Sequence, residues 1–233
     1  MNTMLLLAAV LHFYTIESPP DQATSVTGAW QNQHNSGEII CIADNYFVYT
    51  LYDLTGKKFG ESWGGPVVIE GSTLTINREF FSKDQGFKPH TIQLPFKKTT
   101  LLEIDMQGEK KSFKLLDDGK APLAGNWRIT GRKQGETINP MPLAARRTLK
   151  LLTASRFQWT AFNNETGEFS GTGGGSYTFE NGKYTEHIEF FSRDNNRVGA
   201  SLSFEGKLEN GDWHHSGLSS RGDPIYEIWS RFK

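Results

Sequence analysis

Cysteine, basic charge and long apolar runs are all scarce in this chain of 233 residues. Cys41 is the only cysteine, which excludes an intrachain disulfide bond and any zinc site built on cysteine ligands. Lysine and arginine number 25 against 26 aspartate and glutamate residues, so no basic surplus is available to neutralise a phosphate backbone. We therefore expect no nucleic-acid partner.

The one long apolar run, residues 4–11, is far too short to cross a bilayer as a helix, so we do not expect an integral membrane protein. Its length is typical of the central region of a signal peptide, although no lysine or arginine precedes it and no clear cleavage site follows. We expect residues 1–24 to be a signal peptide with a linker, and the protein to be secreted or periplasmic. A docked or disordered N-terminal segment is the alternative.

Aromatic residues and glycine are abundant, with six Trp, seven Tyr, 16 Phe and 24 Gly. Short runs of alternating apolar and polar residues follow one another, separated by turn residues roughly every eight to twelve positions. This pattern indicates antiparallel strands joined by hairpins, and no strand–helix–strand pattern interrupts it. The sequence therefore predicts an all-β fold.

A stretch of 21 residues occurs twice, at residues 64–84 and again 110 positions later at residues 174–194. The two copies align without a gap and nine positions are identical, which indicates a tandem duplication. We expect one domain over residues 25–119 and a second over residues 120–233. A long run of strands in an open sheet would leave unpaired edges, so each half is predicted to close into a small antiparallel up-and-down barrel.

Two short motifs mark the ends of the halves. The motifs are Gly-x-Trp at Gly28–Trp30 and Gly125–Trp127, and Glu-Ile-Trp-Ser-Arg at Glu227–Arg231. Together they resemble the lipocalin-like, or calycin, barrels. The resemblance implies that Trp30 and Trp127 plug the closed ends of two barrels and that Arg231 packs across the face of Trp127.

The second half is more specifically similar to small lipocalin-like domains of exported bacterial proteins of unknown function. The stretches that carry this likeness are Phe157–Trp159, Gly174–Tyr177, Tyr184–Glu186, Gly211–His214 and Glu227–Arg231. The first half departs from the pattern, because it has no Glu-x-Trp-x-Arg string and Lys114 is the cation nearest to the expected arginine.

Aligned positions of the two halves should share a face, because side chains alternate along a strand. We expect Leu74, Ile76 and Phe80 to face the interior of the first barrel. Their counterparts are Tyr184, Glu186 and Phe190. The other aligned inward positions of the first half are Phe47, Tyr49, Leu51, Val67, Ile69, Leu102 and Ile104. Their counterparts in the second half are, in the same order, Phe157, Trp159, Ala161, Tyr177, Phe179, Trp213 and His215. If the alignment shifts by one residue, His214 takes the place of His215. The first barrel is thus predicted to be filled by aliphatic side chains, and the second to contain aromatic and polar ones.

Polar groups inside a barrel must contact one another, water or a ligand, because an unpaired interior charge costs on the order of several kcal/mol. We expect a non-catalytic protein that holds a small hydrophobic or amphipathic molecule in its second barrel. The expected ligand-contacting residues are Trp159, Tyr177, Tyr184, Glu186, Trp213, His215, Glu227 and Trp229.

Two other functions remain open at this point. In one, Glu186 pairs with Arg231 inside a solid core, and the barrels present their surface to a protein or polymer. In the other, Glu186 and His215 are the acid–base pair of a cavity enzyme. His187, His214 and His215 match no compact metal-ligand spacing, so we expect neither a metal nor another cofactor.

The second half is 13 residues longer than the first before its third strand, with the excess around residues 132–147. Two prolines and the apolar residues Ile138, Met141 and Leu143 lie in this insertion. In lipocalin-like barrels the loop after the first strand folds over the open mouth, and the insertion resembles such a lid. A surface Ω-loop and a contact between the two barrels are the alternatives.

Overall fold

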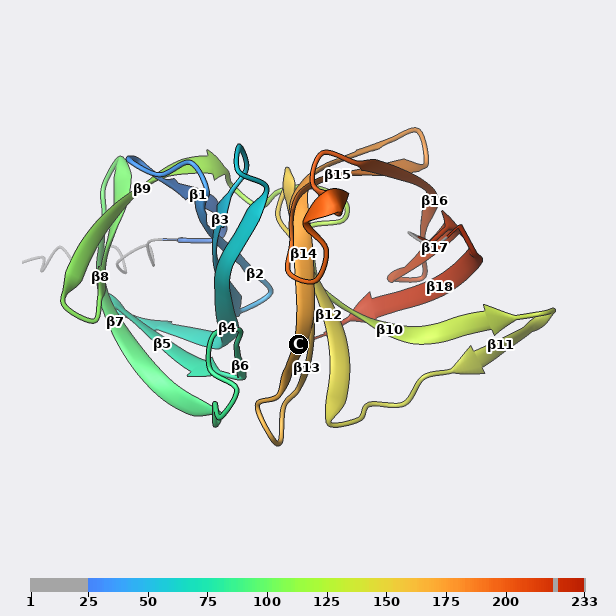
Figure 1. Ribbon diagram of the computed structural model, residues 1–233, viewed down its shortest axis with the longest axis horizontal. Helices are drawn as coiled ribbons and strands as arrows, with labels where there is room; N and C mark the ends of the chain where they lie inside the picture. Colours follow the sequence, from blue (N-terminus) through green and yellow to red (C-terminus); the bar gives the residue numbers. More distant parts are fainter. Residues whose placement is uncertain (1–24, 220–221, 233) are drawn as a thin grey trace, which may run out of the picture.

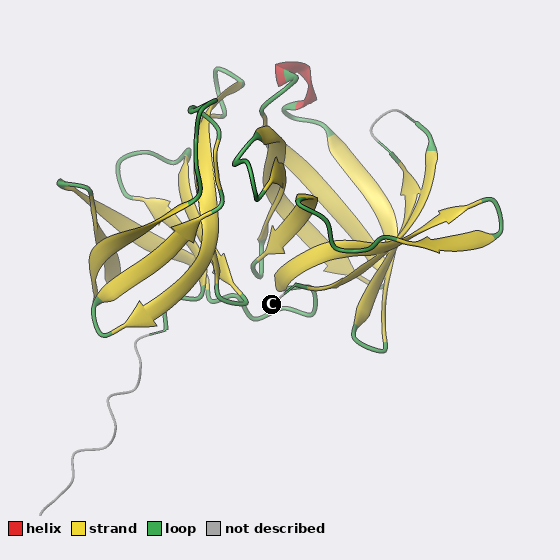
Figure 2. Cartoon of the chain, turned by 90° about the horizontal axis from the view of Figure 1, so that it is seen from below, coloured by secondary structure: helices red, strands yellow, loops and turns green. Residues whose placement is uncertain are grey.

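A computed structural model describes residues 25–219 and 222–232. The predicted signal peptide and linker lie outside these residues. The described chain forms two closed, eight-stranded antiparallel barrels in tandem, which lie side by side in both views (Figures 1 and 2). The all-β prediction and the tandem two-barrel architecture are confirmed.

The strands follow the chain in a simple meander. Barrel 1 contains β1 (Gly28–Asn32), β2 (Glu38–Ala43), β3 (Tyr46–Asp53), β4 (Lys58–Glu70), β5 (Thr73–Arg78), β6 (Phe80–Phe81), β7 (His90–Lys98), β8 (Leu101–Met106) and β9 (Glu109–Asp117). Barrel 2 contains β10 (Gly125–Gln134), β11 (Thr137–Pro140), β12 (Arg146–Leu152), β13 (Arg156–Asn163), β14 (Phe169–Glu180), β15 (Lys183–Phe191), β16 (Ser201–Glu209), β17 (Asp212–Leu218) and β18 (Pro224–Arg231), with the 3-10 turn η1 (Asn195–Arg197) after β15.

Each barrel closes by pairing its first strand with its last. In barrel 1, β1 pairs with both β2 and β9, and in barrel 2, β10 pairs with both β12 and β18. β5 and β6 together occupy one position beside β4, and β11 pairs with the outer end of β10, so each closed wall has eight strands. This arrangement removes the open sheet edges that the strand count would otherwise leave. Two tandem barrels of this kind fit a calycin-like fold.

Two strand boundaries bear on which residues face the barrel interior. Gly64 and Gly174 each lie inside one long continuous strand, β4 or β14. The alternating run over residues 73–81 is divided at Glu79 into β5 and β6.

Three apolar cores hold the molecule together. One fills barrel 1 around Trp30, Ile40 and Ile76, and another fills barrel 2 around Trp127 and Tyr184. The third lies between the barrels, where the outer face of β2 and β3 meets that of β12 and β13. The two barrels are therefore joined by an apolar cluster to which both contribute.

The interface corrects one expectation about the barrel interior. Phe80 was predicted to point inward with Leu74 and Ile76, but it packs in the core between the barrels, as does its counterpart Phe190. The break at Glu79, matched by the irregular register near Gly174, reverses the face on which the following residues lie.

The aromatic contacts across the interface have a two-fold pattern. The ring of Phe80 lies 5.2 Å from that of Phe162 and 6.2 Å from that of Phe169. The ring of Phe190 lies 5.0 Å from that of Tyr52 and 6.2 Å from that of Phe59, the residues that occupy the matching positions of barrel 1. Each barrel thus offers the other the same surface.

Polar contacts reinforce the same interface. Gln158 lies at its centre and hydrogen-bonds to Thr50 (2.7 Å) and Ser62 (2.9 Å) of barrel 1, and to Thr172 (3.0 Å) of its own barrel. Asp117 at the end of β9 accepts hydrogen bonds from the β12–β13 turn, including one of 2.6 Å from the Ser155 hydroxyl.

Candidate functional site

Trp30 and Trp127 are held in the same way in the two barrels. The indole N–H groups of Trp30 and Trp127 each donate a 2.8 Å hydrogen bond to the carbonyl four residues earlier. The Arg231 guanidinium lies 4.3 Å from the centre of the Trp127 ring. In barrel 1 the cation near Trp30 is Lys98, at 5.6 Å, and not Lys114.

Arg231 does not reach Glu186, so the proposed Glu186–Arg231 bridge is wrong. Arg231 instead donates hydrogen bonds to Asp44 of barrel 1 (2.9 Å) and to the Ala124 carbonyl. Its position at the end of β18 places it over the plug, at the end of the barrel where the two halves meet. Arg231 therefore belongs to the structural frame.

Glu186 is held inside barrel 2 by a lysine that sequence reasoning missed. The Lys150 ammonium lies 2.9 Å from the Glu186 carboxylate, and both side chains are almost completely buried. The Tyr184 hydroxyl donates a 3.0 Å hydrogen bond to the same carboxylate oxygen. Burial, with the nearby Glu186 charge second, raises the pKa of Tyr184 well above its ordinary value, so its hydroxyl stays protonated and can donate.

Lys150 also lies among aromatic rings. Its ammonium is 5.4, 5.3 and 5.1 Å from the ring centres of Tyr184, Trp213 and Trp229, within the range of cation–π attraction. The matching residue of barrel 1 is Ile40, 110 positions earlier, and it packs in that barrel's core. The repeat that identified Glu186 could therefore also have identified Lys150.

A second buried polar group surrounds Glu227. The Arg132 guanidinium donates a 2.6 Å hydrogen bond to this carboxylate, and the Trp229 indole donates one of 3.1 Å. Burial would raise the pKa of Glu227, but the neighbouring His215, Lys150 and Arg132 outweigh it and hold the pKa at about 2. Glu227 is therefore ionised at neutral pH.

Three buried polar atoms beside this group have no hydrogen-bond partner within the described part of the chain. They are the indole nitrogen of Trp213 and both ring nitrogens of His215. His215 Nδ1 lies 3.6 Å from Glu227, beyond hydrogen-bonding distance. Burial lowers the pKa of His215, although the nearby Glu227 carboxylate opposes this shift. Buried polar atoms nearly always have a partner, so these three require an explanation.

The other residues proposed from the sequence also gather around this interior. Tyr177 donates a 2.7 Å hydrogen bond to the Thr153 carbonyl, and Trp159 is a partly buried member of the same core. His214 points outward and contacts Tyr226, so no shift of the alignment is needed. No hydrogen bond joins Glu186 to His215 in the described structure, and residues 25–219 and 222–232 contain no cluster suited to a metal.

The insertion before β12 forms a hairpin. β10 extends beyond the barrel and pairs with β11, and the two project outward at the right of Figure 1. Ile138, Met141 and Leu143 are exposed. β10 is paired with β12 only over Gly125–Arg128, and beyond Arg128 it pairs with β11 instead.

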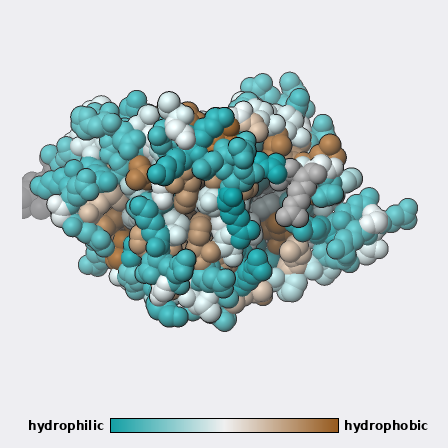
Figure 3. All heavy atoms as spheres, in the orientation of Figure 1, coloured by the Kyte–Doolittle hydropathy of each residue, from teal (hydrophilic) through white to brown (hydrophobic). Residues whose placement is uncertain are grey.

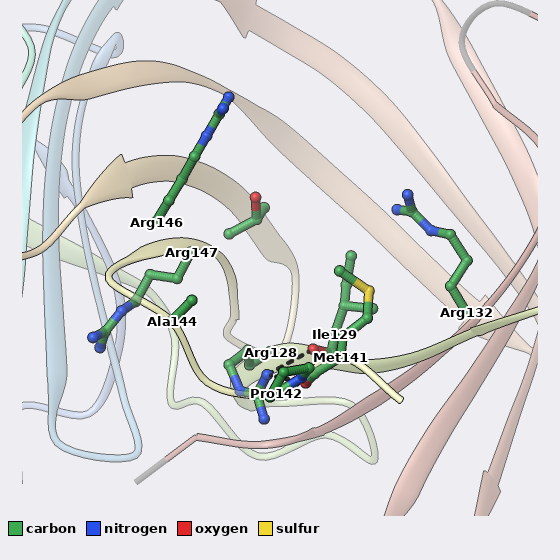
Figure 4. Close-up of a pocket in the computed structure, with 9 residues that line it drawn as sticks. Arg128, Ile129, Arg132, Met141, Pro142, Ala144, Arg146 and Arg147 are labelled. Atoms are coloured by element: carbon green, nitrogen blue, oxygen red, sulfur yellow. Dashed lines mark hydrogen bonds between the residues drawn. The ribbon is translucent and has the colours of Figure 1, made fainter. Parts of the chain in front are cut away.

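A pocket of about 290 Å³ opens where β10 and β12 part. Arg128, Arg132, Arg146 and Arg147 line it, as do Ile129, Met141, Pro142, Ala144 and Thr148 (Figure 4). Thr148 precedes Lys150 by two positions on β12 and so shares its inward face. The pocket therefore lies at the mouth of barrel 2, on the face of β12 that also carries Lys150, although neither Lys150 nor Glu186 lines it.

The four arginines differ in their partners. Arg132 binds Glu227, and Arg147 points toward barrel 1, with Nη1 4.0 Å from Glu79 (Figure 4). Arg128 donates to two backbone carbonyls, of Ile129 (3.0 Å) and Met141 (2.8 Å). The Arg146 side chain is exposed and makes no hydrogen bond or ion pair with any described residue, while its backbone pairs with Asn163. Two of the four positive charges therefore have no acidic partner in the described structure.

Barrel 1 has a pocket of similar size with a different lining. Its volume is about 280 Å³, and its lining includes Trp63 and Tyr49, the cations Arg78 and Lys111, and two acidic residues. Behind it, Glu38 accepts 2.7 Å hydrogen bonds from Tyr49 and Lys111. Barrel 1 thus also contains a buried carboxylate, which the prediction of a purely aliphatic filling had not included.

The outer surface is mostly polar. On the face in Figure 3, hydrophilic residues cover most of both barrels, with hydrophobic ones visible in patches between them. Within the described residues no helix has the length and apolar character needed to cross a membrane.

No protein-family model matches this sequence, and a search of curated proteins found no match either. The residues inside barrel 2 and at its mouth are therefore the basis on which a function can be proposed.

Proposed function

We propose that this protein is a lipocalin-like, non-catalytic binding protein, secreted or periplasmic, that holds a small hydrophobic or amphipathic ligand in barrel 2. One observation carries the proposal: among the described residues, three buried polar atoms of His215 and Trp213 have no hydrogen-bond partner inside an aromatic-lined barrel. A polar atom of a ligand could pair with these groups and remove the cost of burying them alone, which is about 1–3 kcal/mol for each.

The comparison between the barrels supports this reading. The positions that Trp213 and His215 occupy on β17 are Leu102 and Ile104 on β8, both fully packed in the core of barrel 1. The same fold is therefore stable with aliphatic residues at these positions. Polar and aromatic side chains at the same places are typical of a small-molecule site, in which a few polar groups orient a ligand between apolar walls.

The mouth pocket shares Ile129 with the barrel core, so a ligand held in barrel 2 would approach from this side. Thr148 and Ile129 line it, and Ile129 also belongs to the barrel core. A ligand of this kind would place its apolar part against the core residues and leave its polar end at the mouth. An amphipathic molecule fits that environment better than a purely polar one.

Tryptophan fluorescence tests the proposal directly. Trp127, Trp159, Trp213 and Trp229 all lie in the barrel 2 core, so a ligand there should quench or shift their emission in a saturable titration. A panel of small apolar and amphipathic compounds would be titrated into the wild-type protein and into Trp30→Phe/Trp63→Phe, which removes the tryptophans of barrel 1. We expect the same saturable signal in both proteins.

His215→Ile is the matched variant, because it installs the residue that barrel 1 carries at the same position. We expect it to fold and to bind at least tenfold more weakly, since the ligand loses its polar partner while the core gains an apolar one. If no compound in the panel gives a saturable signal, or if His215→Ile binds as tightly as the wild type, the proposal is wrong.

A further inference from the structure

We infer that the ligand of barrel 2 is an anion, and that its acidic group is held at the mouth by Arg146 and Arg128. The inference rests on the function proposed above and adds the chemical class of the ligand. It is independent of the interior polar atoms, because its support comes from the charges around the mouth pocket.

The first support is an imbalance of charge. Four arginines line the pocket, and no acidic side chain does so among the residues that the structure describes. Glu227 compensates Arg132, and Glu79 faces Arg147. The positive charges of Arg128 and Arg146 remain. A pocket with an excess of two cations attracts anions and disfavours cationic ligands.

The second support is that this charge is specific to barrel 2. Arg128 pairs with Leu149 across the β10–β12 ladder just as Gln31 pairs with Ile39 across the β1–β2 ladder. Arg146 likewise corresponds to Ser36, and Thr148 to the buried Glu38. Barrel 1 is therefore uncharged or negative where barrel 2 is positive, so the arginines are not a requirement of the shared fold.

The third support is the form of the groups that are available. A guanidinium presents a planar set of donors that can bind carboxylate, sulfonate or phosphate oxygens through two hydrogen bonds. Arg128 is fixed by its bonds to the Ile129 and Met141 carbonyls, and two of its five donors are sufficient for these. The exposed Arg146 can move onto the ligand from the opposite strand.

The fourth support concerns the rest of the pocket. Ile129, Met141 and Pro142 contribute apolar surface next to the arginines. A small inorganic anion would leave that surface in contact with water, whereas the apolar part of an amphipathic acid would cover it. The geometry therefore favours an organic anion over free phosphate or sulfate.

A matched pair of fluorescent probes tests the charge. 8-Anilino-1-naphthalenesulfonate is an amphipathic anion, and N-phenyl-1-naphthylamine has the same rings without the sulfonate. Both brighten in apolar sites. We expect the wild-type protein to bind the anionic probe about tenfold or more tightly than the neutral one, as one charge-assisted hydrogen bond would produce. Raising the salt concentration should weaken the binding of the anionic probe and leave the binding of the neutral probe unchanged.

Arg146→Gln is the main variant, since the exposed side chain has no partner whose loss would unfold the protein. We expect it to weaken binding of the anionic probe about fivefold to tenfold and to leave the neutral probe unchanged, while Arg146→Lys retains part of the effect. The control is Lys133→Gln, which removes one positive charge from the exposed end of β10, outside the pocket lining. It should change neither affinity.

The outcomes separate this inference from the function on which it rests. If the neutral probe binds barrel 2 as tightly as the anionic one, or Arg146→Gln has no effect on the anionic probe, the ligand class is wrong and the binding function stands. If inorganic phosphate at millimolar concentration competes as well as an unlabelled fatty or aromatic carboxylate, an organic anion is excluded. If neither probe binds, both the proposed binding function and this inference are wrong.

Discussion

At the scale of single residues, the two barrels show alternative solutions to the same interior position. Barrel 1 places Ile40 and Ile76 on facing inward positions of β2 and β5, and barrel 2 places Lys150 and Glu186 there. A buried ion pair is weak support for stability, because the desolvation of both charges offsets their attraction. The pair in barrel 2 is therefore better explained by the polar groups that it places in the barrel interior than by its contribution to the free energy of folding.

This leads to a test in which barrel 1 supplies the replacement residues. Lys150→Ile or Glu186→Ile alone leaves one buried charge without its partner, and each should lower the free energy of unfolding by about 3–5 kcal/mol. The double substitution removes both charges and should lower the free energy of unfolding by less than either single substitution. Its remaining cost is the hydrogen bond that Tyr184 donates to Glu186. Urea denaturation of the four proteins measures this difference.

Ile40→Val provides the control, because it makes a small change at the same position of the other barrel and should cost about 0.5–1.5 kcal/mol. A double variant less stable than both single variants would show that the ion pair stabilises barrel 2 beyond what apolar packing supplies.

The inward position of Glu186 was predicted correctly from the sequence, but Arg231, the partner considered for it, is not the residue that it contacts. Alternation along β15 was enough to predict that Glu186 points inward, since it lies two positions from Tyr184 on a regular strand. Its partner depends on which strands face each other across the barrel, and that distance is not visible in one sequence. The interior position of Lys150 could be inferred only from the repeat, by comparison with Ile40 at the matching position of barrel 1.

At the scale of strands, glycine allows β4 and β14 to continue as single long strands. A Cβ atom on Gly65 would lie 1.8 Å from the Asn77 carbonyl oxygen, and one on Gly175 would lie 2.0 Å from the His187 carbonyl oxygen. These glycines let neighbouring strands approach closely where the barrel wall bends sharply. The strand continues because its glycines remove the side chains that would obstruct it.

We therefore expect Gly175→Ala and Gly65→Ala each to lower stability by about 1–3 kcal/mol or more, because the added methyl group meets backbone that cannot rotate away. Gly86→Ala is the matched control, since its nearest new neighbour would be a flexible Asp84 oxygen at 3.5 Å. Thermal unfolding monitored by circular dichroism compares the three. An equal effect at Gly86 and Gly175 would contradict the steric explanation.

The strands of the insertion could be predicted only in part from the sequence. Its length and its exposed apolar residues were evident in the sequence, but the β10–β11 hairpin was not, because four residues of β11 carry no period long enough to identify a strand. The parting of β10 from β12, which creates the arginine pocket, follows from that hairpin. The pocket was therefore not predictable from the sequence.

At the scale of the whole molecule, the interface makes the barrels a single unit. The apolar core between them contains residues of both, and the ties of Gln158, Asp117 and Arg231 cross it. We expect one cooperative unfolding transition in calorimetry. Phe80→Ala and Phe190→Ala, which occupy equivalent places, should each cost about 3–5 kcal/mol and lower that one transition by similar amounts.

The control for this prediction is Ile69→Ala, a substitution at a partly exposed residue on β4 that should shift the transition little. Two separate transitions in the wild type, of which only one responds to each phenylalanine variant, would show that the barrels unfold independently.

The tandem arrangement could be predicted from the repeat, whereas the relative placement of the barrels could not. The residues that reveal the packing, Phe80 and Phe190, were assigned to the interior because strict alternation was assumed past Glu79. A break of one residue in a strand reverses the face of everything that follows. Such breaks are set by tertiary contacts more than by local composition.

The near-equivalence of the contacts on the two sides of the interface has a consequence for the origin of the protein. A patch that meets its own copy about a two-fold axis is what a symmetric dimer of separate chains requires. A single-barrel ancestor could therefore have assembled through this surface before its gene was doubled. Once the partners were covalently joined, each interior was free to change without its twin, so that Lys150 and Glu186 could replace aliphatic residues in one barrel alone.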